Sequence, residues 1–368
     1  MLKVIDIVYY SHNDHVEPQP VLDIHAPATG FAEFIKDKVD IQFVKHLNYE
    51  GTETINDIKY TFFKSGNHFW HIPFKTHRYI KSQRPDIVIV EGLIFPLQLI
   101  MLKLQLGKKV KIIAQHHGER PFTGIKGSMQ KLAGRFVDTW LFTSTGNATA
   151  WIENRIIKNV TRCREVLEGS TYFKRKDKAE SKERLGITKK NNFLWVGGLD
   201  KNKDPFTMLQ AFEKYIAHDP GAMLYMIYQD NSLLNEVKLI IKTRIALKSK
   251  VKLIGKIDHE ELPYWFSAAD FYISCSHRES TGYALLEAMA CGCIPVITDI
   301  PSFKKMSSNG KVGFLYPAGN EDALAMTLQH LSMINREEQS ATVEKYFYEN
   351  CSFKNIADDL YRIFNEVT

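Results

Sequence analysis

The sequence has few cysteines and lacks the short motifs of several large enzyme classes. Its five cysteines are scattered, and no two pairs have the spacing of a zinc site, so we expect reduced thiols and no metal site. Neither a Walker A string nor a G-x-G-x-x-G fingerprint occurs, which removes the main support for an ATPase or a dinucleotide-dependent oxidoreductase. Internal repeats and low-complexity tracts are also missing. The sequence therefore reads as an ordinary globular chain.

Long hydrophobic runs are missing as well. The most apolar segment, 93–106, is interrupted by Pro96, Gln98, Lys103 and Gln105 and is too short to span a bilayer. The first residues, MLKVIDIVYY, enter a strand pattern directly, without the basic, apolar and cleavage regions of a secretory leader. These observations predict a cytoplasmic protein, and they leave peripheral attachment to the inner face of the membrane open.

The charge of the chain is modest and unevenly spread. Its 368 residues are 44% hydrophobic and 24% charged, which is typical of a soluble protein with two domains. Residues 1–170 hold 22 Lys+Arg against 17 Asp+Glu, whereas residues 171–368 hold 26 against 25. The surplus in the first part favours contact with an anionic membrane or an acidic acceptor, although a slightly basic solvated surface is the simpler interpretation.

Short β-branched runs alternate with helical patterns in two series, which predicts parallel sheets built from βαβ units. In the first series we expect strands at 4–9, 41–45, 87–91, 111–115 and 139–143, and helices at 30–38 and 97–106. In the second we expect strands at 193–196, 223–228, 251–254, 271–275, 294–298 and 313–316, and helices at 205–216 and 283–291.

A charged stretch at 170–190 separates the two series and is typical of a linker region, with a short helix at 178–185. We therefore expect an N-terminal Rossmann-like domain over 1–170 and a C-terminal Rossmann-like domain over 171–350. The amphipathic pattern near the end of the chain predicts a terminal helix over 351–368 that packs back on the N-terminal domain.

The most informative segment is DFYISCSHRESTGYALLEAMACGCIPVITD, which ends at Asp299. A predicted strand ends near Ser274, a polar loop follows, and a helix opens around Tyr283. The amides of Gly282, Tyr283 and Ala284 would point outward with the positive end of the helix dipole behind them, which is a binding site for a phosphate group.

Two carboxylates, Glu279 and Glu287, flank this predicted phosphate site. Carboxylates accept hydrogen bonds from hydroxyl groups, so the pair can hold two separate polyol groups with a phosphate between them. On the residues alone, an ordinary loop glutamate and an ordinary helix glutamate explain the pattern equally well.

The string E-x7-E followed by AMACG-x-PV resembles the donor-site signature of family 4 retaining glycosyltransferases, which have the GT-B fold. The resemblance implies that Glu279 contacts hydroxyls of the donor sugar and takes part in catalysis. It further implies that amides around Gly282 and Tyr283 hold the distal phosphate and that Glu287 binds the ribose.

A second string, VGGLDKNKD, resembles the family's V-G-R-L-D-x-x-K-G. In the family the Arg and the Lys clamp the diphosphate, which implies this role for Lys203. Gly198 stands where the family has Arg, and Asp204 stands where it has Gly. The missing Arg removes a bidentate donor, and Lys201 and Arg278 are candidates to compensate for it.

Further resemblance continues on both sides of these strings. The loop after Gly255, with Ile257, corresponds to the loop that reads the nucleobase in relatives, whereas Asp270 is more typical of a structural cap. Upstream, KIIAQHHGERP matches a strand that ends in His-Gly near the cleft. The match implies that His117 contacts the donor or the acceptor, with His116 as the competing choice.

Three weaker signals complete the sequence. Thr29-Gly30 is the nearest equivalent of the Gly-Gly turn that the family has near the donor phosphates, and Glu168 stands in place of an Asn. His68 and His71 have no carboxylate at ligand spacing, so we interpret them as structural residues rather than metal ligands.

The sequence thus predicts an α/β protein of two Rossmann-like domains that face each other across a cleft. The resemblance implies a metal-independent hexosyltransferase that moves a sugar, with retention, from a UDP- or GDP-sugar to a glycan, lipid-linked or small-molecule acceptor; no cofactor and no nucleic acid are expected. The alternatives are a catalytically impaired sugar-nucleotide-binding protein and a sugar-nucleotide epimerase on the same fold.

Overall fold

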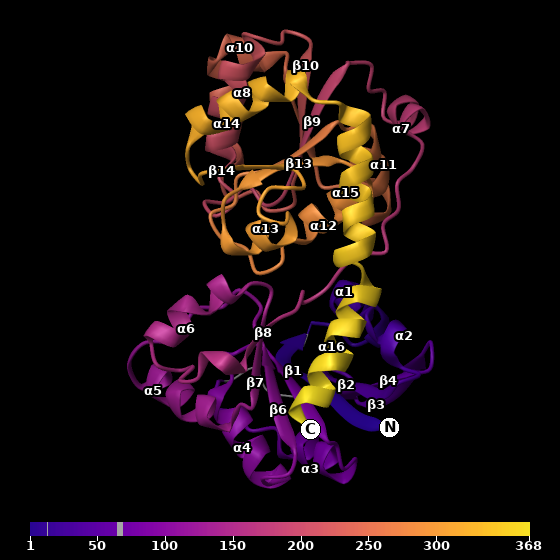
Figure 1. Ribbon diagram of the computed structural model, residues 1–368, viewed down its shortest axis with the longest axis vertical. Coiled ribbons are helices and arrows are strands. Elements are labelled where there is room, and N and C mark those ends of the chain that lie inside the picture. Colours follow the sequence, from indigo (N-terminus) through magenta and orange to yellow (C-terminus); the bar gives the residue numbers. More distant parts are fainter. Residues whose placement is uncertain (13, 65–68) are drawn as a thin grey trace. The chain divides into compact units, whose positions relative to one another are not determined.

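The computed structural model describes residues 1–12, 14–64 and 69–368, and the chain divides into two compact units (Figure 1). The N-terminal unit comprises Met1–Ser170 together with Phe353–Thr368, and the C-terminal unit comprises Thr171–Ser352. Each unit has its own β-sheet and its own hydrophobic core. The predicted fold class, α/β with two Rossmann-like domains, is therefore confirmed.

The N-terminal sheet has the strand order β3-β4-β2-β1-β5-β6-β7-β8, and within it only the β3–β4 pairing is antiparallel. The chain moves from β1 to β2 on one side of β1 and returns to β5 on the other, so the order reverses between β1 and β5. The strands are β1 (Leu2–His12), β2 (Val39–Leu47), β3 (Gly51–Ile55), β4 (Ile58–Phe63), β5 (Ile87–Glu91), β6 (Lys111–Gln115), β7 (Thr139–Phe142) and β8 (Cys163–Glu165).

Helices cover both faces of this sheet because successive strand residues point to opposite sides. In β5, Ile87 and Ile89 belong to one core cluster and Val88 and Val90 to another. The first cluster contains residues of α1 (Pro18–Thr29), α2 (Ala32–Ile35) and α16 (Phe353–Val367). The second contains residues of α3 (Phe74–Ser82), α4 (Pro96–Leu106), α5 (Gly124–Ala133) and α6 (Thr149–Glu153).

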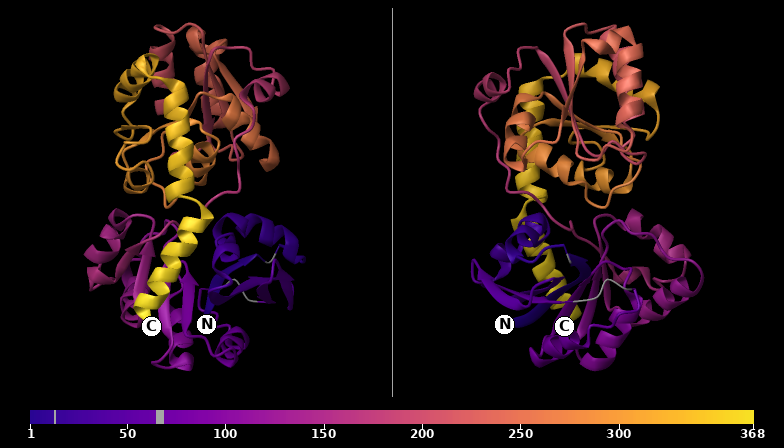
Figure 2. Two further views of the ribbon diagram at one scale, coloured as in Figure 1. Left: turned by 45° about the vertical axis from the view of Figure 1, so that its right-hand side comes forward. Right: turned by 180° about the vertical axis from the view of Figure 1, so that it is seen from behind.

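The last helix of the chain, α16, lies alongside elements of the N-terminal unit (Figure 2). Its buried residues recur every three or four positions, as an amphipathic helix requires, and they join the cluster that holds α1 and α2. These residues are Phe353, Ile356, Ala357, Leu360, Ile363 and Phe364.

The C-terminal sheet is parallel throughout, with the order β11-β10-β9-β12-β13-β14, which reverses between β9 and β12. Its strands are β9 (Asn191–Val196), β10 (Ala222–Ile227), β11 (Val251–Gly255), β12 (Phe271–Ser274), β13 (Ile294–Thr298) and β14 (Phe314–Tyr316). Its helices are α7 (Lys178–Arg184), α8 (Pro205–Ile216), α9 (Leu234–Thr243), α10 (Ile245–Lys248), α11 (Leu262–Ala268), α12 (Tyr283–Ala290), α13 (Pro301–Met306), α14 (Glu321–His330) and α15 (Arg336–Asn350).

All the strands predicted from the sequence are present, and β5, β6, β13 and α8 have the predicted bounds. The hairpin β3–β4 was not predicted, although its turn residues Asn56 and Asp57 have φ values of 51° and 65°, as a two-residue hairpin turn requires. Helix α1 follows β1 in a segment for which no helix was predicted, and the helix expected over 30–38 is reduced to α2. Among the described residues, no helix has the length and apolar content needed to cross a bilayer.

Candidate functional site

Two loops of the C-terminal unit meet where the strand order reverses, the usual ligand position in an open parallel sheet. One loop follows β9 and the other follows β12, and three contacts join them. His277 N–H donates to the carbonyl of Asn202 (2.8 Å), Asn202 Nδ2 donates to the carbonyl of Arg278 (3.0 Å), and the His277 ring bonds to Asp204 Oδ2 (3.0 Å). These bonds hold the two loops in one arrangement.

Lys203 and Glu279, both predicted site residues, form an ion pair between these loops. Both side chains are largely buried. Asp200 supports the Lys203 turn by accepting the backbone N–H groups of Asn202 (2.6 Å) and Lys203 (2.9 Å). Ser302 Oγ donates to the carbonyl of Glu279 (3.0 Å). A bound diphosphate would compete with Glu279 for the Lys203 ammonium group.

Helix α12 follows the loop that carries Glu279, and Gly282 is its N-cap residue. Gly282 has a φ of 78°, and a Cβ atom there would lie 2.7 Å from Cε1 of Phe303, so no other residue fits without a shift. Leu285 N–H donates back to the Gly282 carbonyl (2.9 Å). Amides in the first turn of an α-helix point outward along the helix axis, so the start of α12 at Tyr283 and Ala284 suits an anion.

Glu287 lies on the second turn of α12 and is 7% exposed. Its Oε1 bonds to Nε2 of His259 (3.0 Å), and the His259 ring packs against Phe173 with 4.7 Å between the ring centroids. Burial raises the pKa of Glu287, although His259 opposes the shift. The hydrogen bond with Glu287 raises the pKa of His259. The sequence carried no signal for His259, because 28 residues separate it from its partner.

The backbone conformation at Asp204 explains why the resembling family has Gly at this position and why Asp is tolerated here. Asp204 has a left-handed backbone (φ 46°), which costs little for Gly and is tolerated by Asp. The Asp204 carboxylate caps α8 by accepting Thr207 N–H (3.1 Å) and Thr207 Oγ1 (2.6 Å). These cap bonds offset the backbone strain.

Acidic side chains occupy the surroundings of Gly198, where the family has Arg. A Cβ atom at this position would lie 2.9 Å from Oδ2 of Asp200 and 3.1 Å from Cβ of Asp230. An arginine side chain would therefore require Asp200 or Asp230 to shift. The two residues suggested as substitutes, Lys201 and Arg278, are both exposed in the same pair of loops.

The predicted base loop follows β11. Gly255 has a φ of 84°, its carbonyl accepts Tyr228 N–H (3.1 Å), and a Cβ atom there would meet open space. Ile257 is half-buried.

One acceptor near the paired loops was not predicted from the sequence. Asn202 Oδ1 is buried and has no hydrogen-bond partner among the described residues. Asp270 instead ties the sheet together by accepting Asn192 N–H (2.8 Å), as a structural residue does.

His117 follows β6 in the N-terminal unit, and a carboxylate lies at each of its ring nitrogens. Nε2 bonds to Glu91, at the end of β5, and Nδ1 lies 3.1 Å from Oε2 of Glu168. Burial by itself would lower the pKa of His117, but the two carboxylates outweigh it and raise the pKa well above the ordinary value. A carboxylate at each ring nitrogen favours the protonated ring, and a ring held in this way suits hydrogen-bond donation rather than the role of a base.

Two further ionisable residues, Asp6 and Lys45, lie buried close to Glu91 and His117. Burial raises the pKa of Asp6 well above its ordinary value, and the neighbouring Glu91 raises it further. Burial also lowers the pKa of Lys45. Burial would raise the pKa of Glu91, but His117 and the hydrogen bond with Asp6 lower it, which favours the charged form of Glu91.

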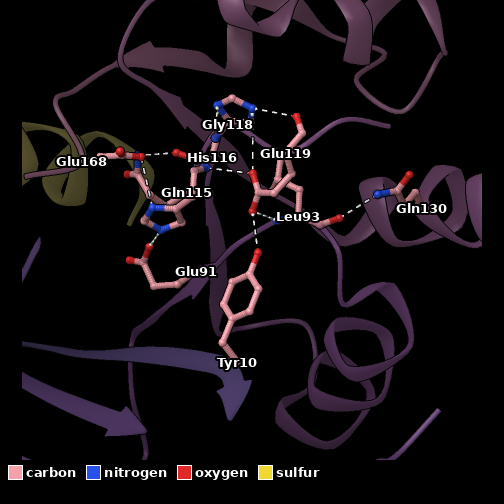
Figure 3. A network of polar contacts seen from close by, with 10 residues as sticks. Tyr10, Glu91, Leu93, Gln115, His116, Gly118, Glu119, Gln130 and Glu168 are labelled. Atoms are coloured by element: carbon pink, nitrogen blue, oxygen red, sulfur yellow. Dashed lines mark hydrogen bonds and ion pairs between the residues drawn. The ribbon is translucent and has the colours of Figure 1, made fainter. Parts of the chain in front are cut away.

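His116, the competing choice, is part of the core. It is 4% exposed, and its ring packs against Phe142 and Trp151. Gly118 N–H donates to His116 Nδ1 (3.3 Å), and His116 Nε2 bonds to the carbonyl of Glu119 (3.1 Å). Figure 3 shows this turn, with Glu91 and Glu168 on one side of it.

Glu119 fixes the same turn from within. Its Oε1 accepts Leu93 N–H (3.1 Å) and the Tyr10 hydroxyl (3.4 Å), and its Oε2 accepts His117 N–H (2.8 Å) (Figure 3). Glu91, Glu119 and Glu168 were not among the predicted site residues. Glu119 lies in the KIIAQHHGERP string and Glu168 stands in place of an Asn, but no role followed from either position, and Glu91 carried no signal.

Gly30 does not form the glycine turn that was expected near the donor phosphates. Gly30 is the C-cap of α1 with ordinary helical φ of −60°, and its N–H donates to the carbonyl of Ala26 (2.9 Å), so this amide is not available to a phosphate. His71 is exposed, and His68 lies outside the described residues. Within the described ranges, no group of three or more His, Cys, Asp or Glu side chains is placed to hold a metal ion.

A small pocket in the N-terminal unit is lined by residues of α4, α5, α6 and the loop after β5. Its lining is apolar apart from Gln130, whose Nε2 donates to the carbonyl of Leu93 (2.9 Å) and whose Oε1 accepts Phe122 N–H (2.7 Å). Because no charged side chain lines it, this cavity does not suit a phosphate group.

The fold and the loops at the strand-order reversal define the class of protein. Anabaena Alr3699/HepE in complex with UDP superposes with a TM-score of 0.75 and 14% identity, covering 99% of this chain and 100% of that one. The sucrose-phosphate synthase from Thermosynechococcus elongatus gives a TM-score of 0.72 and 14% identity, covering 99% of both chains. The predicted GT-B fold class is thus confirmed.

The family follows from the C-terminal unit, because residues 177–348 match the family model "Glycosyl transferases group 1". This part of the chain is therefore similar to the group 1 glycosyltransferases, and the predicted resemblance is confirmed at that level.

Curated relatives agree with this assignment. N-acetyl-alpha-D-glucosaminyl L-malate synthase of Bacillus anthracis is 22% identical over 65% of this chain and 62% of its own length. A GDP-mannose:cellobiosyl-diphosphopolyprenol alpha-mannosyltransferase of Xanthomonas oryzae pv. oryzae is 28% identical over 38% of this chain and 37% of its own length. The matches thus span between about a third and two thirds of these relatives.

Proposed function

We propose that this protein transfers a sugar from a nucleotide-diphosphate sugar, with retention of the anomeric configuration, to a glycan, lipid-linked or small-molecule acceptor. The observation that carries the proposal is the junction of the loops after β9 and β12. There Lys203 meets Glu279 directly before the amide-lined start of α12, with Glu287 one turn further on. A cation, helix amides and two carboxylates in this order suit a diphosphate flanked by a sugar and a ribose.

The roles follow from the chemistry of each group. The α12 amides and Lys203 bind the diphosphate and stabilise the charge that it gains as it departs. The Glu279 carboxylate accepts hydroxyls of the donor sugar and fixes its anomeric carbon, and Glu287 accepts the ribose hydroxyls. In this proposal the departing phosphate accepts the proton of the acceptor hydroxyl on the same face, so no protein base and no metal ion is required. Gly255 and Ile257 border the base, which is uracil or guanine.

The His117 imidazolium ion contributes hydrogen-bond donors to the donor or the acceptor. Because Glu91 and Glu168 already hold both of its ring nitrogens, a ligand gains a donor from His117 when one carboxylate moves away. Its proposed role is therefore positioning and charge, and the N-terminal unit is proposed to bind the acceptor.

One observation favours a second candidate, a protein that binds sugar nucleotides without transferring the sugar. Asp200 and Asp230 border Gly198, where an arginine would otherwise clamp the diphosphate, so negative charge lies close to the proposed phosphate position. A weakened clamp stabilises the leaving group less.

A donor-release experiment separates the two candidates. The protein is incubated with UDP- and GDP-sugars without an acceptor, and free nucleotide diphosphate is measured together with thermal stabilisation by each ligand. Saturating ligand at about a hundred times its dissociation constant stabilises by about 2.7 kcal/mol. Stabilisation with slow release supports transfer, whereas stabilisation without any release supports a binding protein. Neither effect with any sugar nucleotide contradicts both.

A further inference from the structure

The net positive charge of the chain comes from a single stretch. Residues 69–136 hold 12 Lys+Arg and 3 Asp+Glu, a surplus of nine, whereas the whole chain holds 48 and 42. The remaining residues therefore hold 36 basic and 39 acidic side chains, and they carry a slight negative charge. The basic character noted for the first part of the chain is thus concentrated in about a fifth of the sequence.

This stretch forms α3, α4 and α5, which pack side by side on one face of the N-terminal sheet (Figure 1). Acidic partners lie within 4.0 Å of Lys75 and Lys103 alone among its twelve cations, as far as the described residues show. Ten of the twelve side chains are exposed: Lys75, Arg78, Lys81, Arg84, Lys108, Lys109, Arg120, Lys126, Lys131 and Arg135.

Large apolar side chains are exposed between these cations. Phe74 on α3 is 49% exposed, Leu104 on α4 is 63% exposed, and Ile125 and Leu132 on α5 are 78% and 44% exposed. In α5 the buried residues Gly127, Gln130 and Ala133 face the core, so Ile125 and Leu132 stand on the opposite side together with Lys131. We call the exposed side of α3, α4 and α5, together with the exposed cations of the segments that flank these helices, the basic face.

We propose that the basic face binds the surface of an anionic lipid bilayer. Acidic headgroups attract the unpaired cations, and each Lys or Arg near such a surface contributes about 1 kcal/mol. Exposed Phe, Leu and Ile side chains enter the boundary between headgroups and acyl chains, as in helices that lie flat on a membrane. A soluble polyanion such as a nucleic acid would use the cations but leave the apolar side chains in water. The combination therefore favours a bilayer.

This surface is separate from the residues proposed to bind the donor, since Lys203, Glu279 and Glu287 all belong to the C-terminal unit. Binding to membranes can therefore be measured without a sugar nucleotide. A failure of vesicle binding would therefore leave the proposed sugar transfer untouched, and a failure of sugar transfer would leave the proposed membrane binding untouched.

The test is co-sedimentation of the full chain with phosphatidylcholine vesicles that contain or lack phosphatidylglycerol. We expect binding to the anionic vesicles, and we expect it to weaken as salt shortens the Debye length from about 10 Å at 0.1 M to about 3 Å at 1 M. Equal binding to both kinds of vesicle, or binding to neither, would overturn the proposal.

Matched variants locate the surface. Lys108→Glu with Lys131→Glu should weaken vesicle binding by at least about thirtyfold, since two membrane-facing cations are lost. Lys238→Glu with Lys242→Glu makes the same change in net charge on exposed positions of α9 and should have little effect. Ile125→Asp should also weaken binding, in contrast to Ile245→Asp, which changes an apolar side chain that is 88% exposed on α10.

Two results would decide against the basic face. If the α9 pair weakened binding as much as the Lys108 and Lys131 pair, net charge rather than this surface would be responsible. If the protein bound polyphosphate as tightly as vesicles and Ile125→Asp changed neither, the ligand would be a soluble polyanion. Circular dichroism melting of each variant shows that the fold is retained.

Discussion

Each unit has a histidine in contact with glutamate side chains. The two histidines differ in how many carboxylates they contact and in how exposed they are. His117 lies between Glu91 and Glu168 with Asp6 and Lys45 buried behind it, so its proton is held from both sides. His259 has one carboxylate, Glu287, and its side chain is 62% exposed. The first arrangement fixes a charge, whereas the second leaves a carboxylate that a ligand can share.

The comparison teaches that contact with a carboxylate outweighs the effect of burial on the charge of an imidazole. Burial opposes the positive charge on both histidines, yet both pKa values are raised because an anion is in contact. A strand-end position is common to Glu91 and to the loop of Glu279, since both lie where the strand order of their sheet reverses. The C-terminal loops carry the match to the family model, and the N-terminal ones lie outside it.

The largest effect is expected for Glu279→Gln in the C-terminal site. Losing the charge should lower kcat by on the order of a hundredfold while nucleotide diphosphate affinity changes little, because the carboxylate contacts the sugar rather than the nucleotide. Steady-state kinetics, calorimetry and a melting curve on one preparation check this, with Glu236→Gln on α9 as an exposed control. A turnover equal to that of the parent protein would end the donor-sugar role of Glu279.

Glu287→Ala should come next in size. A charged hydrogen bond contributes about 1.5 to 3 kcal/mol, so the affinity for nucleotide diphosphate should fall at least about tenfold. Because burial raises the pKa of Glu287, affinity in the parent protein should also fall on acidification at a higher pH than for an ordinary glutamate. Calorimetry over a pH series tests both points, and an unchanged dissociation constant in a folded variant would refute them.

A smaller effect, this time on the N-terminal site, is expected for Glu168→Gln. The His117 pKa is raised in the folded protein, so its contribution to stability is full below the unfolded value of about 6.5 and is lost as the pH rises through the folded value. Removing one carboxylate should lower that folded value, so the contribution should be smaller and its loss should be complete at a lower pH.

Histidine signals in NMR spectra and melting temperatures over a pH series measure this shift. The His259 titration serves as the internal control, because its carboxylate partner is Glu287. If His117 titrated identically in the variant, its charge would not depend on the pair of carboxylates.

The smallest effect is expected for His259→Asn. The variant loses one hydrogen bond to Glu287, so nucleotide affinity at neutral pH should fall only a few-fold, in line with about 0.5 to 1.5 kcal/mol for such a bond. Since His259 opposes the rise of the Glu287 pKa, the loss of affinity on acidification should move to higher pH. A pH profile identical to that of the parent protein would show that His259 does not tune this carboxylate.

Local sequence patterns made much of the secondary structure of the C-terminal unit predictable. Strand and helix periodicities are local, and they placed β13 and α8 within their observed bounds. Glu287 follows Gly282 on one helix, so the spacing between the phosphate site and this carboxylate was already fixed by the chain. The hairpin β3–β4 had the same kind of local signal in its alternating residues and Asn56-Asp57 turn, and it was missed.

By itself, the sequence determined the two series of α/β units, the strings around Lys203 and Gly282, and the excess of cations in 69–136. Tertiary structure alone decided that Lys203 meets Glu279 across 76 positions and that Glu91 and Glu168 hold His117. The physical reason is that such contacts depend on strand order and loop path, which bring distant residues to one edge of a sheet. Periodicity records which face a side chain occupies, but it does not record which neighbour it will meet there.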